Sequence, residues 1–136
     1  MPQKHSIHTA TIQTTGAVAI YRAVGFDGAQ ASVAGQKVRG VATTIAAIGE
    51  HLAVDVVGST IVQTGAAVAV GDSLVVDNQG RAVPAGVLGI AAGATPVTST
   101  AADGAILTGA DLPEFVFADA LEAASAADQL IEVQLR

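Results

Sequence analysis

Short apolar runs separated by turn-forming residues recur along most of the chain. The best-specified segment is Val68–Pro84, in which two valine-rich runs flank the tetrapeptide Asp77-Asn78-Gln79-Gly80. Valine favours extended backbone because its branched Cβ restricts χ1, and Asn and Gly tolerate the backbone angles of tight turns. The segment therefore predicts a β-hairpin, entered through a turn at Gly71-Asp72.

Three other segments predict strands on similar grounds. Residues 16–26 alternate between two faces and predict a first long strand. Residues 38–57 predict a strand, a turn at Gly49-Glu50 and a second, half-buried strand. Residues 86–93 predict a strand that glycines bend. Residues 94–109 predict a long loop, of a length that is typical of functional loops.

Both ends of the chain admit two structures. Residues 1–15 are polar and threonine-rich, which fits an edge strand or an arm that orders only against a partner. We expect residues 1–15 to be a flexible N-terminal arm and residues 16–136 to be a single domain. Residues 118–127 fit a short helical turn or an irregular strand, and residues 130–135 alternate as a terminal strand does.

Two stretches far apart in the chain share a design. In both GVATTIAAIGEHLAVDV and ADALEAASAADQLIEVQL, a small-residue strand meets an acidic turn and is followed by an alternating strand. The two fall out of register by one residue, so this is a similarity of pattern and not a demonstrated repeat. It favours a mainly β fold, in which antiparallel hairpins close a small barrel-like single domain.

Composition adds an expectation of self-association. The 136 residues are 51% hydrophobic but only 13% charged and 3% aromatic, and alanine supplies much of the apolar content. Alanine buries little area, so such a core gains less than one built from Leu and Phe. We therefore expect further burial against copies of the same chain.

Charge and hydropathy argue against two classes of partner. The net charge is −6 and the six basic residues are scattered, whereas phosphate binding needs clustered Lys and Arg. The longest apolar run, Ala82–Ala94, is too short to span a bilayer, and no apolar signal segment follows Met1. We expect neither nucleic acid nor membrane as a partner.

No residue set in the chain predicts a reaction or a cofactor site. There is no cysteine, no phosphate-binding glycine motif and no GxSxG. His5 and His8 would approach one metal ion only on a helix, and we interpret them as part of a solvated segment. His51 as a base would need an orienting carboxylate and a nucleophile, and only the presence of both residues supports a pairing with Ser59. The prediction is therefore no catalytic residue, no cofactor and no metal ligand.

The acidic residues have structural explanations. Asp72, Asp77 and Asn78 do not match the spacing of a calcium loop and are better explained as turn formers. The C-terminal quarter is acidic, which fits a solvated face or a contact with a basic partner; its members are Asp111, Glu114, Asp119, Glu122, Asp128 and Glu132. A carrier domain needs a lysine at a hairpin tip, and neither Lys4 nor Lys37 lies at one.

An ordered set of these motifs resembles a known family. The set comprises G-V-A-x-x-x-A-A-x-G-E-x-x-x-V over residues 40–54, the hairpin AVGDSLVVDNQGRAVP over residues 69–84, and ALEAASAADQLIEVQL over residues 120–135. In this order they resemble the small capsid decoration proteins of tailed bacteriophages, also called cement proteins. The resemblance covers most of residues 39–136.

The resemblance implies a β-barrel-like protein, commonly trimeric, on the outer surface of the virion. Such a protein is assembled in the host cytoplasm, binds the major capsid protein, bridges neighbouring capsomers and stabilises the shell against DNA pressure. Residues 1–15 would pair with a capsid strand by β-augmentation. The alternative is a non-viral β-domain that mediates protein–protein interactions.

Overall fold

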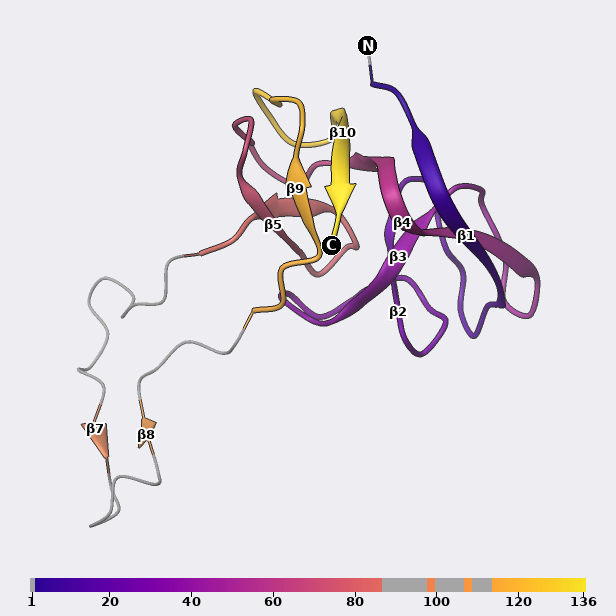
Figure 1. The fold of residues 1–136 in the computed structure, drawn as a ribbon. Coiled ribbons are helices and arrows are strands. Elements are labelled where there is room, and N and C mark those ends of the chain that lie inside the picture. The colour runs from indigo at the N-terminus through magenta and orange to yellow at the C-terminus, as the bar shows by residue number, and fades with distance from the viewer. Residues whose placement is uncertain (1, 87–97, 100–106, 109–113) are drawn as a thin grey trace.

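A computed structural model describes residues 2–86, 98–99, 107–108 and 114–136, and Figure 1 shows their arrangement. The strands are β1 (His5–Gln13), β2 (Ala23–Gly25), β3 (Val38–Ala42), β4 (His51–Gln63), β5 (Ser73–Val76), β6 (Ala82–Pro84), β7 (Thr98–Ser99), β8 (Leu107–Thr108), β9 (Ala118–Ala120) and β10 (Leu130–Leu135). No helix occurs in the described ranges, so none there could cross a membrane. The predicted mainly β class is confirmed.

Eight of the strands form one antiparallel sheet that curls toward a barrel (Figure 1). The order is β2-β3-β4-β10-β9-β5-β6, and β1 pairs with β4 outside this path. The two ends of the path approach each other, because the Ala23 amide in β2 donates to the Gly80 carbonyl, next to β6, at 2.8 Å. The predicted barrel-like architecture is therefore confirmed, and β7 and β8 form a separate pair.

β4 is the longest strand and lies at the centre of the sheet. Asp55 pairs with Thr9 of β1 and with Val41 of β3. Ser59 pairs with His5 of β1 and with Gln134 of β10. A strand residue has one neighbour on each side, so β3 and β10 share the edge of β4 that is opposite β1.

The hairpin and the C-terminal predictions are confirmed. β5 pairs with β6 in the register Leu74↔Pro84 and Val76↔Ala82 around the predicted turn. β10 buries Ile131, Val133 and Leu135, as the alternation of its sequence predicts. Residues 118–127 take the irregular-strand alternative, with β9 followed by bends and an isolated bridge at residue 124. The strand predicted for residues 86–93 and most of the 94–109 loop lie outside the described residues.

The long strand predicted for residues 16–26 is wrong. Only β2 is a strand there, preceded by an isolated bridge at Val18 and a turn at Ile20-Tyr21. Tyr21 has φ 62°, a left-handed conformation that breaks an extended run and that bulky residues rarely adopt. A hydrophobic alternation cannot reveal such a turn, because tyrosine is a strong strand former.

The core consists of two clusters that repeat each other position by position. One cluster holds Ile12, Val18, Val24, Ala42, Ala46, Leu52 and Val54. The other includes, in the same order, Val62, Val68, Leu74, Ala120, Ala124, Ile131 and Val133. Each matched set of seven belongs to one structural half of the barrel, and we call these the first half and the second half. The second cluster also includes Ala23, Ala31 and Val41 from the first half, so the two halves share part of one core.

Hydrogen bonds repeat in the same way. Val18 and Ala46 exchange two backbone bonds of 2.9 and 3.0 Å. Val68 and Ala124 exchange two of 2.8 and 2.9 Å at the equivalent position. Leu52 follows Ala46 by six positions, whereas Ile131 follows Ala124 by seven positions. This difference explains the one-residue slip between the two similar sequences.

Two buried threonines complete the repeated motif. The Thr14 hydroxyl donates to the Ala47 carbonyl at 2.6 Å, and the Thr64 hydroxyl donates to the Ala126 carbonyl at 3.0 Å. Both side chains are buried, at 3% and 0% exposure. Each threonine follows the first strand of its half. Its hydroxyl thus links that strand, through a hydrogen bond, to the turn before the last strand of the same half.

In this structure residues 5–13 form an edge strand, which is one of the two alternatives that the sequence allows for the N-terminal segment. β1 pairs with β4 from His5↔Ser59 to Gln13↔His51, with a bulge around residues 6–9. Gly58 lies opposite this bulge with φ 107°, and a Cβ there would meet the His5 carbonyl and lie 2.7 Å from the Ile7 nitrogen. Glycine therefore permits the close approach. A boundary between an arm and a domain at residue 15 stays a prediction.

A buried carboxylate holds β1 against β4. Asp55 is 0% exposed. Its oxygens accept bonds of 2.8 to 3.0 Å from Ser6, Thr9, Thr60 and Lys4. Burial acts to raise the pKa of this carboxyl, but the four donors outweigh burial and hold the pKa below its ordinary value. Three of the four donors lie in the first nine residues, so the carboxylate anchors the N-terminal segment.

We expect Asp55→Asn to lower the free energy of unfolding by roughly 2 kcal/mol at neutral pH, measured by urea unfolding. The folded-state pKa lies below the unfolded value near 3.8, so the wild-type carboxylate stabilises the fold above that value. Its contribution is lost as the pH falls through the folded pKa. The difference between wild type and variant should therefore shrink on acidification, and a difference that stays constant down to about pH 2 contradicts the assignment.

The repeated threonines make a matched pair for mutation. Thr14→Val and Thr64→Val should each lower the free energy of unfolding by about 1 kcal/mol, because each leaves a carbonyl without its donor. The double variant should show the sum, since the two sites share no partner. Thr11→Val on the exposed face of β1 is the control and should be neutral. A large loss at one threonine with none at the other would refute the equivalence of the halves.

Candidate functional site

The structure does not bring the histidines into a metal or catalytic group. His5 and His8 lie on β1, which is a strand and not the helix that a metal pair would need. His51 and Ser59 occupy the same strand eight residues apart, so roughly 25 Å separates them along an extended chain. Among residues 2–86 and 114–136, no three His, Asp or Glu side chains gather as metal ligands would.

Asp72 and Asp77 act as turn formers, as predicted. An oxygen of Asp72 accepts from the Ala69 amide at 2.9 Å. One oxygen of Asp77 accepts from the Gln79 and Arg81 amides, each at 2.8 Å, and its other oxygen accepts from the Arg81 side chain at 2.9 Å. The carboxylates are therefore engaged in local backbone geometry.

Part of the acidic C-terminal quarter is neutralised within the chain. Asp119 accepts two bonds from the Arg136 guanidinium at 2.8 and 2.9 Å, which hold its pKa below the ordinary value against the opposing effect of burial. Arg81 bridges Asp77 and Asp128, both at 2.9 Å, and the pKa of its guanidinium is raised mainly by the hydrogen bond to Asp128. Glu122 accepts from the Glu132 amide at 2.9 Å.

Exposed apolar side chains are concentrated in the loops that join the strands of each half. The loops around the Val18–Ala46 bridge expose Ile20, Ile45 and Ile48. The loops and strand ends around the Val68–Ala124 bridge expose Val70, Leu121 and Leu130. We call these two sets the first end and the second end. These side chains are 40 to 75% exposed and belong to neither core cluster.

A shallow hollow contains all three phenylalanines of the chain. It has a volume of about 220 Å³, and its lining is Phe26, Lys37, Val38, Phe115, Val116, Phe117 and Arg136. Phe117 is buried, whereas Phe26 and Phe115 are exposed. The Lys37 ammonium lies 5.1 Å from the centre of the Phe115 ring, within the range of a cation–π contact. The hollow is open and shallow, unlike the deep pockets that enclose small molecules.

The outer edge of β1 is a third accessible feature. β1 pairs with β4 alone among the strands of the described part of the chain. Its nine residues, HSIHTATIQ, include no Lys, Asp, Glu or Pro, the residues that usually protect an edge strand. Ile7 is 79% exposed at its bulge. The edge can therefore accept another extended strand.

Sequence reasoning missed the Asp55 cluster and the two ends. Asp55 fits the alternation of its strand, and only the fold reveals that Lys4, Ser6 and Thr9 reach it. The first end depends on the turn at Tyr21, which the sequence pattern conceals. The repeated sequences were visible but out of register, and aligning them across one inserted residue could have predicted the repeated frame of the two halves.

Comparisons with known proteins agree with this architecture. The chain matches no curated protein sequence. The crystal structure of the head fiber gp8.5 N base in bacteriophage phi29 is similar in fold, with a TM-score of 0.61 and 20% identity over 95% of this chain and 93% of that one. The model of a family described as phage cement protein matches residues 1–135. The chain belongs to the phage cement protein family.

Proposed function

We propose that this chain decorates the outside of a phage head, where it binds the major capsid protein, bridges neighbouring capsomers and stabilises the shell against the pressure of packed DNA. The observation that carries the proposal is the family match over residues 1–135. The protein acts mechanically, with no catalytic residue and no cofactor, from its position on the virion surface after assembly in the host cytoplasm.

The surface features support binding to another protein. Two groups of exposed aliphatic side chains, an aromatic hollow and a strand edge without charged residues are available for contact with a partner. Surfaces of this kind gain free energy when a partner removes them from water. Because the chain belongs to the phage cement protein family, a phage head is favoured as the partner, and the alternative of a non-viral interaction module is disfavoured.

The proposal includes two finer elements. The protein self-associates, most simply as a trimer, because its alanine-rich core leaves apolar surface to be buried between copies. The free edge of β1 pairs with an extended strand of the major capsid protein, which modifies the arm hypothesis: β1 stays in its own sheet and offers its outer edge. Residues 16–136 supply the rest of the domain.

Decoration is tested directly with expanded heads that lack this protein. The purified chain should co-sediment with these heads, saturate at a fixed number of copies, and raise the temperature at which the heads release DNA. Binding without a rise in that temperature would refute the stabilising role. A complete absence of binding to the heads of the phage that encodes the chain would refute the proposed function itself.

The role of the β1 edge is tested by Ile7→Lys. A charge at the exposed bulge should block strand addition and weaken head binding at least about tenfold, because lysine protects edge strands. The free energy of unfolding should stay within about 0.5 kcal/mol of wild type, since the side chain is exposed. Val33→Lys, which places the same charge at an exposed residue outside β1, is the matched control. Equal binding by Ile7→Lys and wild type would exclude the edge as a contact.

A further inference from the structure

The hollow holds nearly all the aromatic side chains of the chain. Apart from Tyr21, every Phe and Tyr lines it. Phe26 is 69% exposed and Phe115 is 43% exposed, and neither belongs to a core cluster. Phenylalanine is enriched at the centres of protein interfaces, where it supplies a large apolar area. The hollow therefore has the composition of a surface that binds another protein.

The charged residues that line the hollow are basic. Lys37 and Arg136 belong to its lining. Arg136 binds Asp119, but Lys37 and the nearby Arg39 form no salt bridge among the described residues. The Lys37 ammonium lies over the Phe115 ring instead. The surface that complements the hollow is therefore apolar and carries a carboxylate.

Two carboxylates adjoin the hollow in sequence but do not line it. Asp27 accepts from the Ala29 amide at 3.2 Å, and Glu114 accepts from the Gly86 amide at 2.9 Å. Backbone amides of the same chain thus hold both carboxylates, and neither forms a salt bridge with Lys37. The Lys37 ammonium remains available to a carboxylate of another molecule.

The turn between β3 and β4 has the complementary chemistry. Ile45 and Ile48 of the first end are 75% and 72% exposed on it. Glu50 follows in the same turn, where one of its oxygens accepts from the Ala47 amide at 3.0 Å. Residues 40–80 contain no Lys or Arg, so no cation of this long segment neutralises Glu50. The turn of residues 45–50 therefore combines exposed aliphatic side chains with a negative charge.

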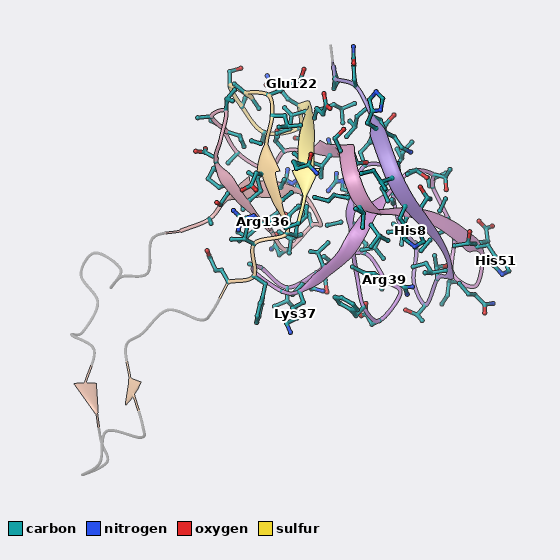
Figure 2. All side chains as sticks on the ribbon, viewed as in Figure 1. His8, Lys37, Arg39, His51, Glu122 and Arg136 are labelled. Atoms are coloured by element: carbon teal, nitrogen blue, oxygen red, sulfur yellow. The ribbon has the colours of Figure 1, made fainter. Side chains whose placement is uncertain are left out.

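The turn and the hollow lie far apart on one molecule. Figure 2 shows Lys37 and Arg136, which line the hollow, well away from His51, which directly follows the turn at the start of β4. The turn of a chain therefore cannot reach the hollow of the same chain. A contact between these two surfaces has to join two molecules.

We propose that the hollow of one copy of this chain binds the turn of residues 45–50 of the next copy. The inference rests on the self-association that forms part of the proposed function, and it names the surfaces that produce it. A contact between two hollows would oppose two copies of Lys37, and a contact between two turns would oppose two copies of Glu50. Charge therefore favours the head-to-tail contact, which closes into a ring when the rotation between copies allows it.

Association is tested in solution, without heads, by the concentration dependence of the mass in light scattering. Phe26→Ser alters the hollow and Ile48→Ser alters the turn. Each should weaken the association of copies at least about tenfold, because a few apolar anchors carry most of the energy of an interface. Val70→Ser, at a side chain that is 66% exposed on the second end, is the matched control and should associate as wild type does. Circular dichroism and urea unfolding confirm that each variant is folded.

Crosslinking tests which surfaces meet. The chain contains no cysteine, so introduced thiols report the contact without background. Val116→Cys places a thiol in the lining of the hollow, and Ala47→Cys places one on the exposed turn. A short bismaleimide should join the double variant into chains of several copies, and it should join a mixture of the two single variants into dimers. Neither single variant should be joined to itself, and Val116→Cys with Val70→Cys is the control that should stay unjoined.

Four outcomes would overturn the inference. Wild type could be a monomer at high concentration, or Phe26→Ser and Ile48→Ser could associate as wild type does. A single cysteine variant could be joined to itself, which would show that like surfaces meet. The double cysteine variant could stay unjoined although wild type is oligomeric. Binding to heads is measured separately with wild type, so a failure here is distinguishable from a failure of the proposed decoration.

Discussion

The structure depends on one strand that belongs to both halves of the barrel. β4 buries Leu52 and Val54 in the first cluster and Val62 in the second. It pairs with β3 along one part of an edge and with β10 along the next part. A single continuous strand therefore completes one half of the barrel and begins the other.

The buried Asp55 carboxylate lies near the middle of this strand, at the end of the part that pairs with β3. A charged group at 0% exposure is costly unless donors surround it, and here three hydroxyls and an ammonium do so. Three of these donors come from the first nine residues of the chain. Because β1 is so polar, hydrophobic alternation alone would not specify its register on β4. The register follows from the need to satisfy the buried carboxylate.

The parts of the fold that could be predicted from the sequence are those in which turn-forming residues and hydrophobic alternation agree. The Val68–Pro84 hairpin and the Leu130–Leu135 strand were predictable because turn formers and strict alternation agree in them. The segment around Tyr21 was not, because a positive φ at a strand-forming residue is imposed by its neighbours. The family was predictable from the ordered set of motifs within residues 40–135, and the family match over residues 1–135 confirms it. The exposed aliphatic and aromatic surfaces arise from loops of distant segments, which no local pattern brings together.

The two halves repeat one hydrogen-bonded frame, and the chain belongs to the phage cement protein family. The central claim is the proposed one, that this chain binds the outside of a phage head and bridges neighbouring shell subunits. The most direct measurement is a cryo-electron microscopy reconstruction of decorated heads at a resolution that separates the strands. The proposed function predicts density for this chain on the outside of the shell, with each bound oligomer in contact with two or more neighbouring shell subunits. Heads without this density, or an oligomer seated on a single shell subunit, would contradict it.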